Sequence, residues 1–149
     1  MARPKPPDAA LQRVVELVLD VVGRGEQRGD IERLMAVWCD DDDITCVHPG
    51  GPRVIGHAAI RAAFEAMFSN GVVDAHPEKV RRQQGPMSAI HSVLERIQLL
   101  TEDGPQVGWV IATNVYVKTD LGWRLAAHHA SPGTETELPE IGEAPSVLH

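Results

Sequence analysis

The chain has 149 residues and a formal net charge of -7, and this length fits one domain with a sizeable hydrophobic core. The negative charge argues against non-specific binding to nucleic acid or to an anionic membrane surface. The two cysteines, Cys39 and Cys46, form no CxxC motif, so we expect neither a zinc site nor a disulfide framework. Free thiols are typical of a cytoplasmic protein. Charged residues interrupt every early apolar stretch, so no signal peptide or membrane span is predicted.

Three amphipathic helices are predicted in the first half of the chain. Residues 1–7 are proline-rich and are expected to form a flexible arm, after which Asp8 should cap the first helix. The apolar stripe of that helix contains Leu11, Val14, Val15, Val18 and Val22. Asp30 should cap a second helix that ends at the aspartate run 40–43, and residues 56–68 form the third.

The remaining segments are predicted to be mostly strands. A short strand over residues 43–48 places Ile44, Cys46 and His48 on one face and ends at the Pro-Gly-Gly that follows. Residues 87–100 fit helical spacing and strand alternation almost equally well. The segments 106–118 and 122–131 are clearer strands, separated by a turn.

The two clear strands should pair as a hairpin with Lys118 opposite Trp123. This register puts His129 on the same face as Asn114 and places His128 on the opposite face. A shift of one residue would exchange the two histidines. Both faces of the hairpin are largely apolar, so we expect helices to cover one face and a second copy of the chain to cover the other.

The order of elements, helices interrupted by one strand and then a run of strands, indicates an α+β fold with helices against one face of an antiparallel sheet. Residues 133–149 are rich in Pro, Glu and Gly and should form an irregular tail. The predicted domain therefore covers residues 8–132.

Four segments carry a resemblance to a known superfamily. They read "RGDIERLMAVWCDDDD", "ITCVHPGG", "VIGHAAIRAAF" and "GWRLAAHHASPG", in that order. Over roughly residues 10–132 the chain resembles the nuclear transport factor 2-like superfamily, and most of all its SnoaL-like branch. The resemblance implies a curved antiparallel sheet wrapped around three N-terminal helices, a cone with a pocket at its open end, and a homodimer across the outer sheet face.

Ketosteroid isomerase, a member of this superfamily, bears directly on His48. In that enzyme the corresponding strand ends in an acid followed by proline, and the acid is the catalytic base. The match places His48 in the base position, although an imidazole replaces the carboxylate. The first helix lacks the donor tyrosine of the isomerase, since Tyr116 is the only tyrosine in the chain. Asn114 lies near the position of a protonated acid, and its amide could donate there.

We expect His48, His129 and Glu95 to be catalytic, because imidazoles and carboxylates exchange protons near neutral pH. The expected substrate-binding residues are Trp38, Phe64, His91, Asn114 and Tyr116. For Trp38 and Phe64 the alternative is a purely structural role in the core. In a strand, His91 and Glu95 share a face, and the alternative is that both lie on a solvated rim and pair with arginines. In a helix the same spacing could suggest a metal pair, but two ligands are too few. For the histidines the alternative is structural hydrogen bonding.

No metal or cofactor is expected. The aspartates at 40–43 lack the spaced pattern of a calcium loop, and the seven histidines form no HExxH motif. We therefore expect a metal-free acid–base isomerase, dehydratase or cyclase that acts on a small carbonyl or polyketide-like compound. Two alternatives stay open: a ligand-binding module without chemistry, and a dimerisation module whose cone is filled by side chains.

Overall fold

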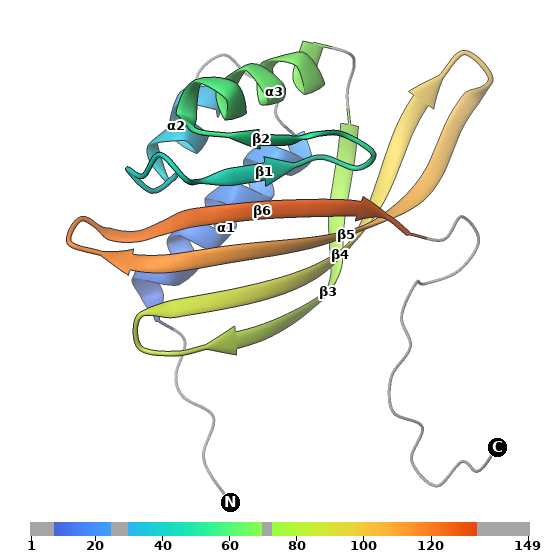
Figure 1. Cartoon of the computed structure of the whole chain (residues 1–149). Helices are drawn as coiled ribbons and strands as arrows, with labels where there is room; N and C mark the ends of the chain where they lie inside the picture. The colour runs from blue at the N-terminus through green and yellow to red at the C-terminus, as the bar shows by residue number, and fades with distance from the viewer. Residues whose placement is uncertain (1–7, 25–29, 70–72, 134–149) are drawn as a thin grey trace, which may run out of the picture.

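The computed structural model describes residues 8–24, 30–69 and 73–133, which fold into three helices and six strands (Figure 1). The helices are α1 (Ala9–Arg24), α2 (Asp30–Ala36) and α3 (His57–Ser69). The strands are β1 (Thr45–Val47), β2 (Arg53–Ile55), β3 (Val73–Gln84), β4 (Ser88–Thr101), β5 (Gly104–Thr119) and β6 (Gly122–Pro132). The predicted arm at residues 1–7 lies outside the described residues, as do residues 134–149 of the predicted tail, so the domain boundaries stay predictions.

The six strands form one curved sheet in the order β2-β1-β6-β5-β4-β3 (Figure 1). Neighbouring strands are antiparallel except β1 and β6, which run parallel. The predicted α+β class and curved sheet are confirmed, but the sheet is mixed rather than purely antiparallel. Because β1 and β6 are far apart in the sequence, no hairpin turn dictates their relative direction.

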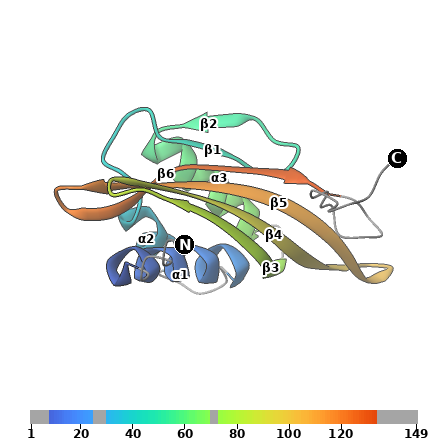
Figure 2. The same cartoon turned by 90° about the horizontal axis from the view of Figure 1, so that it is seen from below.

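The helices cover the inner face of this sheet. α1 crosses behind the strands in Figure 1, and in the view turned by 90° it lies with α2 along one side of the sheet (Figure 2). α3 packs against α2 and β2. The core lies between the helices and the sheet, and its buried residues include Val15, Val18, Leu34, Ile44, Ile60, Phe64, Tyr116 and Leu125. No helix within the described ranges is long and apolar enough to cross a membrane.

Asp8 caps α1 as predicted and ties the start of the helix to the sheet. Its Oδ1 accepts hydrogen bonds from the backbone amides of Ala10 (3.0 Å) and Leu11 (3.2 Å). Its Oδ2 accepts a third bond from the indole Nε1 of Trp123 (3.0 Å), near the start of β6. The aspartate therefore satisfies free amides of the first helical turn and fixes α1 against the β5–β6 hairpin.

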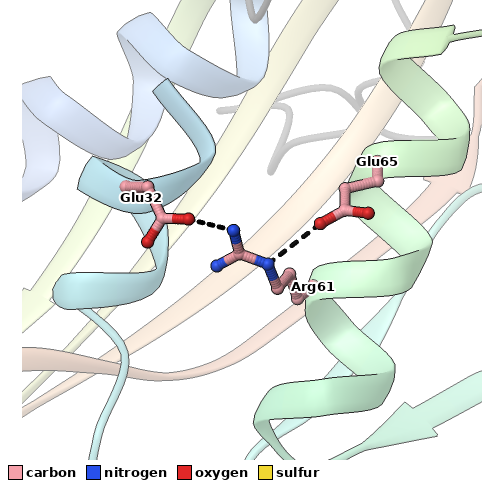
Figure 3. Close-up of polar contacts among 3 residues, drawn as sticks. All are labelled: Glu32, Arg61 and Glu65. Carbon is pink, nitrogen blue, oxygen red and sulfur yellow. Dashed lines mark hydrogen bonds and ion pairs between the residues drawn. The ribbon is translucent and has the colours of Figure 1, made fainter. Parts of the chain in front are cut away.

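Arg61 connects the two shorter helices (Figure 3). Its Nε donates to Glu65 one turn further along α3 (2.9 Å), and its guanidinium also pairs with Glu32 of α2. Glu32 and Glu65 are exposed, so solvent screens these pairs. They orient α2 relative to α3 more than they add to stability.

A bulge alters the predicted register of the β5–β6 hairpin. Lys118 lies opposite Trp123 as expected, and the predicted register holds for the next two pairs. Val115 then pairs with Ala127, which leaves Ala126 as an extra residue on β6. One extra residue turns every later side chain of the strand to the other face.

Candidate functional site

One row of side chains crosses the sheet and contains a residue from every strand. Backbone pairing places Val54, Cys46, His128, Asn114, His91 and Arg82 at the same level, from β2 to β3. His128, Asn114 and His91 are at most 4% exposed. Polar side chains buried to this degree usually have hydrogen-bond partners.

His128 and Asn114 form a buried hydrogen bond in the middle of the row. The His128 Nδ1 lies 2.6 Å from the Asn114 Oδ1, and since the amide oxygen can only accept, the imidazole must donate. The pKa of His128 is lowered to about 4, first by burial and then by the nearby imidazoles of His48 and His129. His128 is therefore neutral near pH 7, with the proton on Nδ1 and a free lone pair on Nε2.

His48 lies beside this pair, just beyond the end of β1. Its ring meets Phe64 of α3 edge to face, with 4.7 Å between the ring centroids, and lies 6.0 Å from the His128 ring. His48 is partly buried, and burial lowers the pKa of its imidazole. Its Nε2 is 3.6 Å from the Cys46 Sγ. Burial raises the pKa of Cys46 to about 12, so this cysteine is a thiol and not an activated nucleophile. We call Cys46, His48, Phe64, Asn114 and His128 the imidazole cluster.

A second group on the inner face consists of buried polar side chains that lack partners. The rings of His91 and Tyr116 lie 5.2 Å apart in an edge-to-face arrangement. Among the residues that the structure describes, none gives a hydrogen bond to the Tyr116 hydroxyl or to either ring nitrogen of His91. Leaving a buried donor or acceptor unpaired costs about 1–3 kcal/mol. Both side chains would therefore gain from a ligand that bonds to them.

Glu95 is the third member of this unpartnered cluster, together with His91 and Tyr116. It is 5% exposed and lies on the face of β4 that also carries His91, about 13 Å further along the strand. Burial raises the pKa of Glu95 to about 7, so its carboxyl group both gives and accepts protons near neutral pH. Burial also raises the pKa of Tyr116; the Glu95 charge adds to this rise, and the Asn114 amide opposes it.

The structure places the predicted site residues in these two clusters, with two exceptions. His48, Phe64 and Asn114 belong to the imidazole cluster. The unpartnered cluster holds His91, Glu95 and Tyr116. Trp38 packs in the hydrophobic core at 3% exposure and belongs to neither cluster as defined. Phe64 is also a core residue, at 1% exposure, and contributes one ring edge to the site.

The second exception is His129, whose predicted position on the inner face is wrong. His129 is exposed, and His128 takes the inner position opposite Asn114. The Ala126 bulge is the physical reason, because it shifts the pairing of β6 by one residue. The tandem histidines were the only signal in the sequence that could have pointed to His128.

The aspartate run forms an exposed turn. Asp40 to Asp43 are all exposed, and the Oδ1 of Asp41 accepts a hydrogen bond from the backbone amide of Asp43 (2.8 Å). In the described part of the chain, no three His, Cys, Asp or Glu side chains converge in a way that could hold a metal ion. The residues of both clusters are instead suited to proton transfer and hydrogen bonding.

Comparison with known proteins identifies the family. Residues 24–135 match the model of the SnoaL-like domain. The chain belongs to the SnoaL-like domain family. No functionally curated protein matches this SnoaL-like domain in sequence.

Several solved structures resemble this SnoaL-like domain. A candidate calcium/calmodulin-dependent protein kinase type II association domain from Thiobacillus denitrificans is 28% identical, with a TM-score of 0.71 over 89% of this chain and 100% of that chain. A candidate dehydratase of the nuclear transport factor 2-like family from Streptomyces avermitilis is 23% identical, with a TM-score of 0.70 over 84% and 95% of the two chains. The calcium/calmodulin-dependent kinase II hub of S. rosetta is 24% identical, with a TM-score of 0.65 over 88% and 100%. The second and third similarities support the fold alone.

Proposed function

We propose that this SnoaL-like domain is a metal-free acid–base catalyst that isomerises, dehydrates or cyclises a small carbonyl or polyketide-like compound. The observation that carries the proposal is the position of two clusters on one inner sheet face. One cluster holds two neutral imidazoles, and the other holds buried polar groups without partners. Titratable groups that burial perturbs in this way are typical of catalytic sites.

His48 is the proposed base. Burial lowers the pKa of His48, so the imidazole is unprotonated near pH 7 and can accept a proton from carbon next to a carbonyl group. It is only partly buried, whereas His128 is 4% exposed and is tied to Asn114. We therefore propose that His48 abstracts the proton. His128 and Asn114 make the surroundings of His48 polar and help to hold its ring in place.

Glu95 and Tyr116 are the proposed acid and donor. The pKa of Glu95, raised to about 7 by burial, lets the protonated carboxyl group give a proton to an enolate oxygen. It takes this proton back when the carbonyl group re-forms and His48 returns its proton to carbon. The pKa of Tyr116 is raised, so its hydroxyl stays protonated and can only donate to such an oxygen. Glu95 has no hydrogen bond or ion pair within the described ranges, and the Asn114 amide lies close enough to the Tyr116 hydroxyl to act on its pKa.

Exchange of α-protons for deuterium tests the proposal without a known substrate. A panel of small ketones and 1,3-diketones is incubated with the protein in heavy water, and the loss of each α-proton signal is followed by NMR. We expect exchange above the buffer rate for at least one probe class. His48→Ala should slow this exchange by about a hundredfold or more, the usual contribution of a general base.

His129→Ala is the matched control, because it removes an exposed imidazole near the same site. This variant should exchange the probes at the wild-type rate. If a probe binds but exchanges no faster than in buffer, the domain is a ligand-binding module without chemistry. Equal losses in the His48 and His129 variants would show that the effect is not specific to the inner face.

Association is the second candidate function, and a different observation favours it. The similarity at 28% identity extends over the whole of an association domain. The sheet also presents exposed apolar side chains, Ile90 at 41% and Val107 at 47%. Ile90 neighbours the buried His91 in β4 and so lies on the outer sheet face. We propose that two copies associate through this outer face.

Light scattering coupled to gel filtration tests this association. Ile90→Lys should convert a dimer into a monomer, because an ammonium group would be buried in the interface. Leu121→Lys is the control, since Leu121 is 76% exposed in the turn between β5 and β6. A wild-type chain that is monomeric at all concentrations would contradict the proposal.

A further inference from the structure

A groove lies at the edge of the sheet, and no member of the imidazole cluster lines it. A groove of about 330 Å³ separates the start of α1 from β3 and β4, and it is lined by Asp8, Leu11, Gln12, Arg82, Gln84 and His91. Figure 1 shows the start of α1 behind the ends of the two strands that this groove joins. The volume is at the lower end of the range for small-molecule sites, so a ligand here must be small.

Within the described ranges, the groove has one acidic and one basic side chain, Asp8 and Arg82, and only the basic one is free to bind a ligand. The Asp8 carboxylate is already bonded by two helix amides and the Trp123 indole, and the charge of Lys118 acts on it as well. Arg82 has no hydrogen bond or ion pair among the described residues. Burial lowers the pKa of the His91 imidazole, and the charge of Arg82 lowers it further. The groove therefore offers one uncompensated positive charge, on a guanidinium whose fork fits a carboxylate.

His91 supplies an independent observation that points to a ligand. It lines the groove, it is 2% exposed, and both of its ring nitrogens lack hydrogen-bond partners among the described residues. Arg82 is its direct neighbour across the β3–β4 pair. A side chain buried with two unpaired polar atoms is costly to the fold, and a ligand that accepts a hydrogen bond from the imidazole removes part of that cost.

We propose that the groove between α1 and the β3–β4 edge binds a small organic carboxylate. Arg82 binds the carboxylate group, His91 donates a hydrogen bond to it, and the amides of Gln12 and Gln84 extend the polar rim. Leu11 provides the apolar contact for the rest of the ligand. The groove shares His91 with the unpartnered cluster, but the proposed base and acid, His48 and Glu95, do not line it, so ligand binding here and acid–base activity can be tested separately.

Phenylacetate and phenylacetamide are matched probes for this site, because they have nearly the same shape and differ in charge. Binding is followed by the imidazole signal of His91 in a proton–carbon correlation spectrum, assigned by its loss in His91→Gln. Phenylacetate should shift this signal in a saturable way and raise the pKa of His91, since a bound anion favours the imidazolium form. Phenylacetamide should bind at least about tenfold more weakly.

Arg82→Gln should weaken phenylacetate binding by about tenfold or more, because it removes a charge-assisted hydrogen bond. Arg81→Gln is the control: it removes the same charge from the next residue, which lies on the other face of β3. Equal affinity of the two probes would overturn the proposal, as would equal effects of the two arginine variants. Loss of the His91 shift in His48→Ala but not in Arg82→Gln would place the ligand in the acid–base site and also overturn it.

Discussion

Replacing Glu95 by glutamine should make the domain more stable, and the gain should appear only as the pH rises. The pKa of Glu95 is about 7 in the fold, against an ordinary value of 4.5. Because the folded-state pKa is the higher of the two, the folded protein holds this proton more tightly than the unfolded chain between pH 4.5 and about 7. The wild-type free energy of unfolding should therefore fall across this interval.

The size of the effect follows from the difference between the two pKa values. Each pH unit of that difference corresponds to about 1.4 kcal/mol, so a fully ionised Glu95 costs the folded state on the order of 3 kcal/mol at pH 8. Glutamine keeps the shape of the protonated acid and never ionises. We expect Glu95→Gln to match the wild type near pH 4.5 and to exceed it by on the order of 3 kcal/mol above pH 7.

Urea unfolding, followed by tryptophan fluorescence at fixed protein concentration from pH 4.5 to 8, measures this difference. Glu102→Gln is the control, because Glu102 is exposed in the turn between β4 and β5, and its curve should follow the wild type throughout. A stability difference between Glu95→Gln and the wild type that stays constant from pH 5 to 8 would refute the reasoning. It would mean that the carboxyl group is solvated or paired in the folded chain.

Three further predictions concern the core and the imidazole cluster. Asn114→Leu should reduce the free energy of unfolding by about 1–3 kcal/mol in urea titrations, because it leaves the Nδ1–H of His128 buried and unpaired. Phe64→Ala should cost about 3–5 kcal/mol in the same assay, whereas Met87→Ala, at a side chain that is 61% exposed, should change stability by less than about 0.5 kcal/mol. Cys46 should resist iodoacetamide at pH 8 until urea is added, because the thiol is buried and burial raises its pKa to about 12. Mass spectrometry of the Cys46 peptide measures the labelling, and rapid labelling of the folded protein would contradict this.

The sequence predicted those parts of the fold that depend on local chemistry. The aspartates at positions 8 and 30 correctly located two helix starts, because their side chains favour the first turn over the helix interior. β2 and β3 were not predicted. β2 has three residues, too few for an alternating pattern, and β3 is a polar edge strand interrupted by Pro77.

The site was less predictable than the fold, because pairing between distant strands decides it. Residues 87–100 fit helix and strand alike, and only the neighbours β3 and β5 make them β4. The inward positions of His91 and Glu95 follow from that assignment. The Ala126 bulge has no signature in the sequence, so the register inferred from the turn could not extend to the histidines.

The bulge at Ala126 also bears on how this strand tolerates change. Without the bulge, regular pairing from Leu125 onward would turn His129, instead of His128, to the inner face, where it would lie opposite Ala112. Because the two histidines are consecutive, either alignment of β6 presents an imidazole to the interior. A one-residue slip of the pairing normally turns a buried polar side chain out of the interior. Here it would replace the inward imidazole of His128 by that of His129. The doubled histidine therefore keeps one imidazole on the inner face in both alignments of β6.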